Sequence, residues 1–321
     1  MDCINEEQIY RTYSNYLKQN YHCKVYKLPI NLPVTCPNRK NGTGCSFCAE
    51  AGTGFEALSS AFSVKEQLTC TKEKIKKRYK AEKFIAYFQN YTNTFLPLDQ
   101  FQSYMKEAAM EEEIVELSIS TRPDCIREDY LKVLQKIQTQ FGVKICIELG
   151  LQTVNYHTLR KIDRGHGLAE WLDAVLAVKR YGFTLCTHLI LNLPDDTKED
   201  VLESSKVISA LPVDIVKLHS LYIPYHSRLY SEYKSGKINL CTKEEYLERL
   251  VLFVEHLRDT IVIERMFSRI PEEEAAFSNW GTSWWKLKDE FLLKMEELHS
   301  CQGIKCTYLN GAALAGISPS S

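Results

Sequence analysis

Three cysteines near the start of the chain are the residues whose type and spacing most clearly indicate chemistry. They are Cys36, Cys45 and Cys48. All three fall within residues 35–50, a segment that follows an apolar run and contains Asn41, Gly42 and Gly44. Glycine and asparagine give such a segment the backbone freedom of a tight loop. Three soft thiolates on one loop suit a metal centre, either an iron–sulfur cluster or zinc.

The two kinds of centre need different ligand sets. A structural zinc site takes four protein ligands, usually in two close pairs. Only Cys45 and Cys48 form such a pair, and a fourth ligand would have to come from His22, Cys23 or Cys70. A 4Fe–4S cluster held by three cysteines leaves one iron open to chelate an amine and a carboxylate. That arrangement is used to cleave S-adenosylmethionine (SAM) to a radical, while the protein supplies position and excludes water.

Composition limits the class of protein. The chain has 321 residues, 45 % of them hydrophobic and 25 % charged, which is ordinary for a globular protein. Its net charge of −1 gives no global attraction to nucleic acid. No apolar run is long enough to cross a membrane and the start is polar, so we expect a cytoplasmic protein without membrane partners. The other cysteines are expected to stay free thiols, with Cys125, Cys146 and Cys186 as small buried residues, and the Cys301–Cys306 pair only weakly suggests a second metal site.

Short apolar segments alternate with amphipathic segments along most of the chain. Strands are predicted at residues 25–32, 84–88, 115–120, 144–151, 184–193 and 213–221. Helices are predicted between them at residues 63–80, 98–109, 128–140, 155–162, 168–181 and 198–210. This alternation is typical of right-handed βαβ units and a parallel sheet. We therefore predict an α/β fold, a partial (β/α)6 barrel. The sequence contains no glycine-rich nucleotide-binding fingerprint, which argues against a Rossmann or P-loop enzyme.

The predicted domain organisation has four parts. Residues 1–24 form an N-terminal helical segment, with a helix at 6–20, and residues 25–228 form the core. Residues 229–310 form a mainly helical C-terminal extension packed on the barrel, with helices at 242–260 and 284–298 and a short strand at 261–263. Residues 311–321 form a small, polar tail that is expected to be disordered.

The cysteine segment resembles the motif of radical SAM enzymes, in a C-x8-C-x2-C form instead of the commoner C-x3-C-x2-C. The wide form, with Phe47 before the last cysteine, resembles the branch of the elongator catalytic subunit. It is most similar to the short bacterial MnmL-type proteins that modify the wobble uridine of tRNA. Further matches follow in order at residues 119–124 (ISTRPD), 147–152 (IELGLQ), 164–166 (RGH) and 188–194 (HLILNLP). The resemblance covers roughly residues 25–228.

The resemblance implies one 4Fe–4S cluster on the three cysteines, and SAM bound at the carboxyl ends of the strands. The SAM-binding candidates are Phe47, Gln89, Asn90, Ser120, Arg122, Glu148, Gln152 and Asn192. Phe47 would lie beside the adenine, Glu148 would accept from a ribose hydroxyl, and Arg122 would hold a carboxylate of SAM or substrate. Two alternatives stay open: Glu148 as a core carboxylate paired with a lysine, and Arg122 paired with Asp124 or Asp163.

The chain departs from the family pattern in two places. The Gly-Gly-Glu segment that often holds the SAM amine is replaced by residues 89–94 (QNYTNT), and a glycine of the fifth strand is replaced by Asn192. The group that holds the amine is therefore left open. No single catalytic residue is identified; the candidates are Arg122, His188 and Lys217, with His219 as a further substrate contact.

For the substrate, the resemblance implies the anticodon loop of tRNA and conversion of a carboxymethylaminomethyl group towards aminomethyl. A base in that loop can be splayed into a pocket without breaking a duplex. Implied partners are an electron donor such as flavodoxin or ferredoxin, and a downstream tRNA methyltransferase. Basic faces at residues 72–80 and at Lys179 and Arg180 are expected to contact RNA. Two alternatives remain: a radical SAM enzyme acting on a protein or small metabolite, and a non-catalytic zinc-bound nucleic-acid-binding module.

Overall fold

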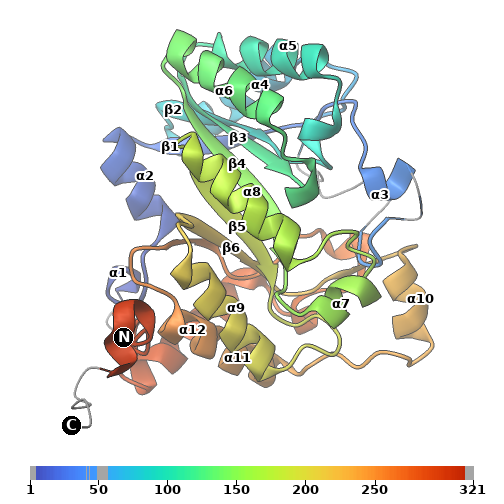
Figure 1. Ribbon diagram of the computed structural model, residues 1–321, viewed down its shortest axis with the longest axis vertical. Helices are drawn as coiled ribbons and strands as arrows, with labels where there is room; N and C mark the ends of the chain where they lie inside the picture. Colours follow the sequence, from blue (N-terminus) through green and yellow to red (C-terminus); the bar gives the residue numbers. More distant parts are fainter. Residues whose placement is uncertain (1–4, 41, 43, 49–56, 315–321) are drawn as a thin grey trace.

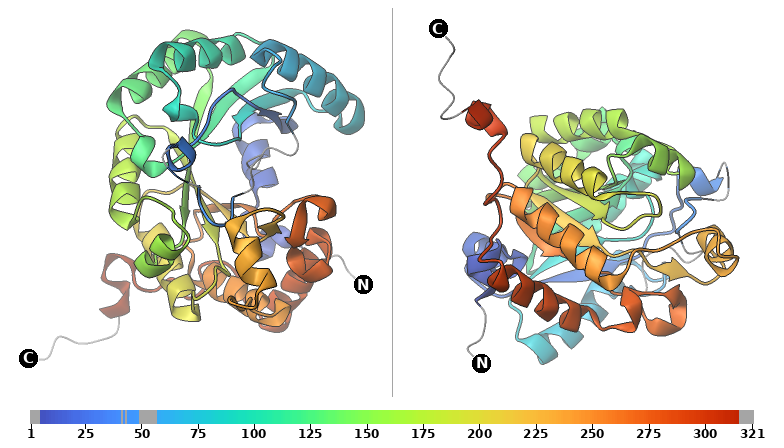
Figure 2. Two further views of the ribbon diagram at one scale, coloured as in Figure 1. Left: turned by 90° about the vertical axis from the view of Figure 1, so that its right-hand side faces the viewer. Right: turned by 90° about the horizontal axis from the view of Figure 1, so that it is seen from below.

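The computed structural model describes residues 5–40, 42, 44–48 and 57–314. At its centre is a seven-stranded sheet whose neighbouring strands are all parallel. In spatial order the strands are β1 (Val25–Ile30), β2 (Lys83–Phe88), β3 (Ile114–Thr121), β4 (Lys144–Gln152), β5 (Thr184–Ile190), β6 (Ile215–His219) and β8 (Val262–Arg265). The sheet curves into an open half-barrel with helices on its outer face (Figures 1 and 2). The predicted α/β half-barrel is confirmed, and β8 of the C-terminal extension adds a seventh strand to the six predicted in the core.

Six long helices cover the outer face. They are α4 (Val64–Tyr79), α5 (Leu98–Ala109), α6 (Glu128–Phe141), α8 (Leu168–Arg180), α9 (Lys198–Ala210) and α11 (Lys243–His256). The start of α4 is fixed by the predicted capping box, in which Ser63 and Glu66 satisfy each other's backbone N–H groups. The Ser63 cap is worth about 1 kcal/mol. None of the described helices is long and apolar enough to cross a bilayer.

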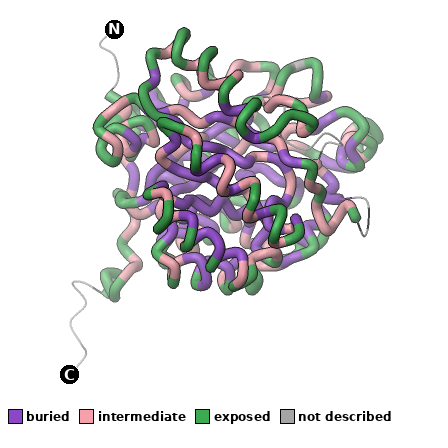
Figure 3. Tube along the Cα trace, turned by 90° about the horizontal axis from the view of Figure 1, so that it is seen from above, coloured by how far each residue is buried: buried purple, intermediate pink, exposed green. Residues whose placement is uncertain are grey.

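The hydrophobic core lies between the sheet and these helices (Figure 3). Strand β2 is buried from Phe84 to Phe88, as expected for a parallel strand covered on both faces. Trp171 of α8 is completely buried, and the rings of Phe101 (α5) and Tyr130 (α6) meet edge to face at 5.1 Å. Packing of this kind fixes the strand ends, where the polar side chains of the site begin.

The N-terminal segment closes the base of the half-barrel. The single helix predicted at residues 6–20 is two helices, α1 (Glu6–Ile9) and α2 (Tyr13–Tyr21). Thr12, between them, forms a parallel bridge with Ile263 of β8, which a continuous helix would not allow. Helix α2 contacts both β1 and β8, the two edge strands of the sheet.

The C-terminal extension ends in α12 (Trp284–Glu297), which packs beside α11 and α1. Its small antiparallel sheet joins β7 (Ile223–Pro224) to β9 (Ala275–Phe277). The remaining short elements are α3 (Pro37–Lys40), α7 (Tyr156–Lys161), α10 (Arg228–Lys234), η1 (Asn93–Phe95), η2 (Pro123–Cys125), η3 (Glu272–Glu274), η4 (Asn279–Gly281) and η5 (Leu309–Leu314). Helix η5 extends to residue 314, inside the tail predicted at residues 311–321, and the rest of that tail lies outside the described residues.

Candidate active site

The cysteine segment lies across the carboxyl ends of the strands, with α3 over the open mouth of the half-barrel (Figure 2, left). Two backbone hydrogen bonds anchor it to the end of α7 and to α10. Ser46 N–H donates to the Ile162 carbonyl at 3.0 Å, and the Ser46 carbonyl accepts from Leu229 N–H at 2.9 Å. Gly44 has φ +83°, which explains the need for glycine there. Asn41, also predicted to loosen the loop, lies outside the described residues.

Polar groups surround the three sulfurs. The Arg164 guanidinium lies 3.5 Å from Cys45 Sγ, and the Arg122 guanidinium lies 3.9 Å from Cys36 Sγ. Asn38 Nδ2 also lies 3.5 Å from Cys45 Sγ. Burial raises the pKa of the Cys48 thiol. Nearby guanidinium groups compensate the negative charge that thiolates bring to a buried metal centre.

The three sulfurs are not grouped as the ligands of a single zinc ion would be. A tetrahedral Zn²⁺ with Zn–S bonds of ~2.3 Å would hold its sulfurs about 3.8 Å apart. Among the described residues, three ligand atoms lie within 4.8 Å of one another only at Glu148, Cys186 and His188, and the loop cysteines form no such group. The three loop sulfurs are therefore not gathered tightly around one zinc-sized site.

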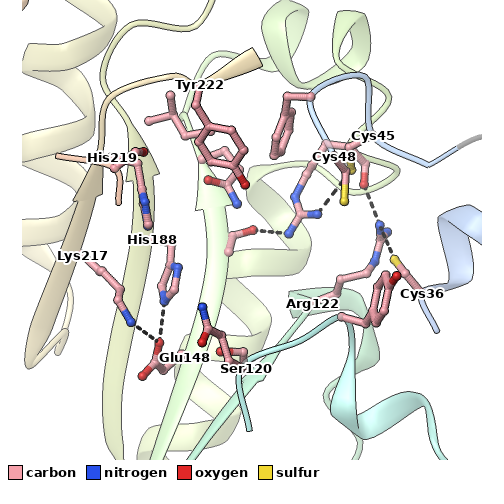
Figure 4. A pocket seen from close by; sticks show the side chains of 18 of the residues that line it. Cys36, Cys45, Cys48, Ser120, Arg122, Glu148, His188, Lys217, His219 and Tyr222 are labelled. Atoms are coloured by element: carbon pink, nitrogen blue, oxygen red, sulfur yellow. Dashed lines mark hydrogen bonds and ion pairs between the residues drawn. The ribbon is translucent and has the colours of Figure 1, made fainter. Parts of the chain in front are cut away.

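A cavity lies between the cysteine segment and the strand ends (Figure 4). All three cysteines line it. The other predicted site residues that line it are Phe47, Gln89, Ser120, Arg122, Glu148, Gln152, His188 and Lys217. The structure thus brings together the cysteine segment and residues that lie in or directly after β2, β3, β4, β5 and β6, as the carboxyl-end rule for such barrels requires.

Two predicted SAM-binding residues, Asn90 and Asn192, are not among the residues that line the cavity. Asn90 is buried, and its side-chain amide donates to Asn31 Oδ1 at 3.2 Å. Asn192 is also buried, and its Oδ1 accepts from Leu221 N–H at 2.6 Å. The Asn192 side chain therefore ties the loop after β5 to the loop after β6 and does not face the cavity.

Arg122 forms an ion pair with Asp124, a residue of its own loop. Its Nε and Nη2 atoms donate to the two carboxylate oxygens of Asp124 at 2.9 and 2.7 Å, and Nη1 donates to the Arg164 carbonyl at 2.8 Å. The guanidinium holds the pKa of Asp124 below its usual range, although burial acts in the opposite direction. These contacts match the alternative considered from the sequence, a structural pair with Asp124.

Glu148 is at the centre of a buried polar network. One carboxylate oxygen accepts from Lys27 Nζ at 2.8 Å and Ser118 Oγ at 2.6 Å. The other lies 3.1 Å from Lys217 Nζ and 2.7 Å from His188 Nε2, as Figure 4 shows. Burial alone would raise the pKa of Glu148, but the two ammonium groups outweigh it and hold the pKa well below its usual range. Glu148 matches the lysine-paired core carboxylate that the sequence left open.

Histidine and lysine side chains continue the wall of the cavity away from the cysteines. The rings of His188 and His219 lie 5.4 Å apart at a tilt of 31°. Burial lowers the pKa of both, and for His219 the neighbouring His188 and Arg265 lower it further. Both imidazoles are therefore neutral at pH 7 and could accept or donate one proton each.

The predicted RNA-contacting faces lie at the opposite end of the sheet from the cysteines. Lys72 and Lys76 of α4 pair with Glu113, the residue before β3, at 3.4 and 2.6 Å. Lys179 pairs with Asp214, the residue before β6, at 2.7 Å. Both sites mark the amino ends of parallel strands, so neither face borders the cavity.

Sequence reasoning missed several residues of the cavity. They are Arg39, Tyr87, Tyr91, Tyr222, Arg265 and Arg269. Tyr222 could have been found, because it comes directly after the strand predicted at residues 213–221. Arg164 was in a matched motif, but its closeness to Cys45 could not be read from the sequence.

Residues 30–208 match the radical SAM superfamily and residues 213–297 match the Radical_SAM C-terminal domain, so the chain belongs to the radical SAM superfamily. Protein YhcC of Escherichia coli is 30 % identical over 291 residues, which cover 89 % of this chain and 92 % of that protein. The uncharacterized protein YtqA of Bacillus subtilis is 28 % identical over 303 residues, 93 % of each chain.

More distant relatives include enzymes whose names refer to tRNA. The tRNA uridine(34) acetyltransferase of Methanocaldococcus infernus is 27 % identical over 137 residues, 42 % of this chain and 25 % of that protein. Among solved structures, the Elp3 of Methanocaldococcus infernus with an N-terminal deletion superposes with a TM-score of 0.66. It is 18 % identical and covers 93 % of this chain and 69 % of that chain, so this likeness is one of fold.

Members of the superfamily use a 4Fe–4S cluster and SAM. The residues present fit both groups. Cys36, Cys45 and Cys48 supply three thiolates in the lining of one cavity, and guanidinium groups border two of them. The cavity beside the sulfurs offers a cationic lining with hydrogen-bonding side chains at the strand ends.

Proposed function

We propose that this radical SAM enzyme acts on tRNA, at the C5 side chain of the wobble uridine, and converts a carboxymethylaminomethyl group towards aminomethyl. The observation that carries the proposal is the three-cysteine segment across the mouth of a cationic cavity. Support for the substrate comes from the relatives that are named for uridine 34 of tRNA. The wide C-x8-C-x2-C spacing supports the same branch.

The bound cofactors would supply the radical chemistry. A 4Fe–4S cluster held by Cys36, Cys45 and Cys48 would supply the electron for reductive cleavage of SAM, and with it the means to remove a hydrogen atom from carbon. The chain's own residues position the reactants around this event. The cysteine segment and the loop at Arg164 cover the mouth, and the strand-end side chains line the cavity.

The charge of the cavity supports a substrate that carries a carboxylate. Its lining includes five arginines and Lys217, but Glu148 is the one carboxylate among the described lining residues. That carboxylate already accepts four hydrogen bonds. A carboxymethylaminomethyl group would bring a negative end into a site with excess positive charge.

The experiment begins with anaerobic reconstitution with iron and sulfide, followed by chemical reduction with SAM present. We expect 5′-deoxyadenosine from the native chain and from Cys70→Ala, a cysteine outside the loop, and none from Cys36→Ala. The absence of 5′-deoxyadenosine from the native chain would show that the radical SAM activity itself is wrong.

The substrate is tested separately by mass spectrometry of nucleosides. tRNA that carries carboxymethylaminomethyluridine is incubated with the reduced enzyme and SAM, and aminomethyluridine is the expected product. A protein reductant of the flavodoxin or ferredoxin class is expected to replace the chemical one, and a methyltransferase would act on the product. An unchanged nucleoside profile despite SAM cleavage would favour a protein or a small metabolite as substrate.

A further inference from the structure

Arg265, the last residue of β8, lines the cavity and is half-buried. Among the described residues, its guanidinium has no hydrogen-bonded or ion-paired partner. Two other arginines of the cavity differ in this respect. Arg122 is bound to both carboxylate oxygens of Asp124, and Arg164 donates to the Gly150 carbonyl at 2.7 Å. Arg265 therefore offers donors that neither of these two arginines has available.

The groups around Arg265 leave it in need of an anion. Its charge lowers the pKa of His219, after burial and His188, and it opposes the burial that raises the pKa of Tyr222. Both neighbours are neutral at pH 7, so neither compensates the guanidinium. A planar guanidinium with free donors matches a carboxylate, which it can bind through two parallel hydrogen bonds.

Its position separates Arg265 from the cysteines. Figure 4 shows His219 and Lys217 on one side of the cavity and the three cysteines on the other, with Tyr222 between them. Arg265 pairs in register with Lys217 across β6 and β8 and acts on His219, so it belongs to the side away from the sulfurs. The amine and carboxylate of SAM are expected at the open iron, on the side of the cysteines. A carboxylate at Arg265 would then belong to a second molecule.

We propose that Arg265 binds the substrate carboxylate and so selects a substrate whose reacting side chain ends in that group. The proposal rests on the proposed function, which supplies the carboxymethyl end of the wobble side chain. The C-terminal extension thereby contributes the specificity residue, through the strand that it adds to the sheet. Arg265 is a substrate-binding residue in this proposal and takes no part in SAM cleavage.

The test compares Arg265→Gln and Arg265→Lys with Arg11→Gln, a matched control. Arg11 is exposed in the segment between α1 and α2, at the base of the half-barrel and outside the predicted RNA-contacting faces. Each reconstituted enzyme is titrated with tRNA carrying carboxymethylaminomethyluridine and with the same tRNA carrying aminomethyluridine, which lacks the carboxylate. SAM cleavage without tRNA is measured in parallel, and circular dichroism and iron content check that each variant folds.

We expect Arg265→Gln to weaken binding of the carboxylate-bearing tRNA at least tenfold, the loss of a charge-assisted contact. The affinity of Arg265→Lys for this tRNA should lie between those of Arg265→Gln and the native enzyme. Lysine keeps the positive charge but lacks the paired N–H donors of the guanidinium. Binding of the aminomethyl tRNA, and the KM for SAM, should stay unchanged, as should every value for Arg11→Gln. If Arg265→Gln does not fold, the Arg265→Lys comparison of the two tRNAs decides the question.

Other outcomes overturn the proposal in distinguishable ways. Equal weakening of the binding of both tRNAs would indicate that Arg265 contacts a phosphate of the tRNA. A raised KM for SAM would indicate that Arg265 binds the carboxylate of SAM. If Arg265→Gln binds both tRNAs as the active native enzyme does, Arg265 does not bind the substrate carboxylate. The proposed function would then still stand. A native enzyme that converts neither tRNA would remove both.

Discussion

The Lys27 ammonium and the Glu264 carboxylate lie 2.8 Å apart, although they belong to β1 and β8, the two opposite edges of the sheet. Lys27 also pairs with Glu148 at 2.8 Å, and Lys217 pairs with Glu148 and Glu264 at 3.1 and 3.0 Å. Two ammonium groups and two carboxylates therefore balance one another inside the half-barrel. This network joins the edges where a closed barrel would have a further strand.

Lys27→Met is expected to destabilise the protein strongly. It leaves Glu148 and Glu264 to share one ammonium group, and an uncompensated buried charge costs roughly 3–5 kcal/mol. Urea unfolding followed by circular dichroism measures the loss.

The control for Lys27→Met is the double variant Lys27→Met/Glu264→Gln, which removes one cation and one anion. It leaves the Glu148–Lys217 pair at 3.1 Å intact, so it should be more stable than Lys27→Met alone. A double variant that loses the sum of both single losses would show that charge balance does not govern this network.

Gly165→Ala is expected to disturb the contact between the loop of residues 164–166 and the cysteine segment. Gly165 has φ +75°, and an added Cβ would lie 2.4 Å from Asn38 Oδ1 and 3.0 Å from Arg122 Nη2. Asn38 and Arg122 both contact cysteine sulfurs, so we expect lower iron content after reconstitution as well as lower stability.

Gly182→Ala separates crowding from backbone strain in this comparison. Gly182 has φ +69°, but nothing lies within 4 Å of its added Cβ, so it bears only the backbone cost of about 1–2 kcal/mol. Its iron content should equal that of the native protein. Equal iron loss in both variants would mean that the contact with Asn38 has no role in holding the centre.

The alternation of apolar and amphipathic segments was enough to predict the strands and helices of the core. The helix at residues 98–109 agrees with α5 at both ends, and the strand at 144–151 misses β4 by one residue. Local periodicity reports local structure, so it could not show that β8, some forty residues after β6, joins the same sheet. For the same reason it did not place Arg265 in the cavity.

The site followed a similar pattern. Types and spacing identified the cysteines, because the ligands lie within thirteen residues of one another along the chain. The roles of Arg122 and Glu148 depended on partners in space: Asp124 for Arg122, and Lys27 and Lys217 for Glu148. The sequence offered these partners as alternatives, but only the fold shows that both residues have them.

Replacement of any one loop cysteine by alanine is expected to abolish most iron binding. A cluster held by Cys36, Cys45 and Cys48 has no spare thiolate on the described part of the loop. Iron and sulfide analysis with the visible spectrum checks this, and Cys70→Ala, a half-buried cysteine of α4, should bind as the native chain does. If the native protein is colourless and contains zinc instead of iron, the prediction of an iron–sulfur cluster is wrong.

Asp196 is expected to make stability depend on pH. Burial raises the pKa of Asp196 to about 6, and Thr158 Oγ1 donates to its carboxyl group at 2.5 Å. The native state therefore holds this proton more tightly than the unfolded state, whose aspartate titrates near ~4. The contribution of Asp196 is full below pH ~4, falls as pH rises to about 6 and is lost above it, ~2–3 kcal/mol in all.

Asp196→Asn removes the titrating group but keeps an oxygen that can accept from Thr158. Its stability should match the native protein near pH 4 and exceed it by ~1–3 kcal/mol at pH 8, with a flatter profile between. Asp195→Asn, at the exposed neighbouring position, should keep the native slope. Urea unfolding at several pH values measures all three proteins. An unchanged slope in Asp196→Asn would mean that another group sets the pH dependence, since the buried carboxyl group is the only feature that this substitution alters.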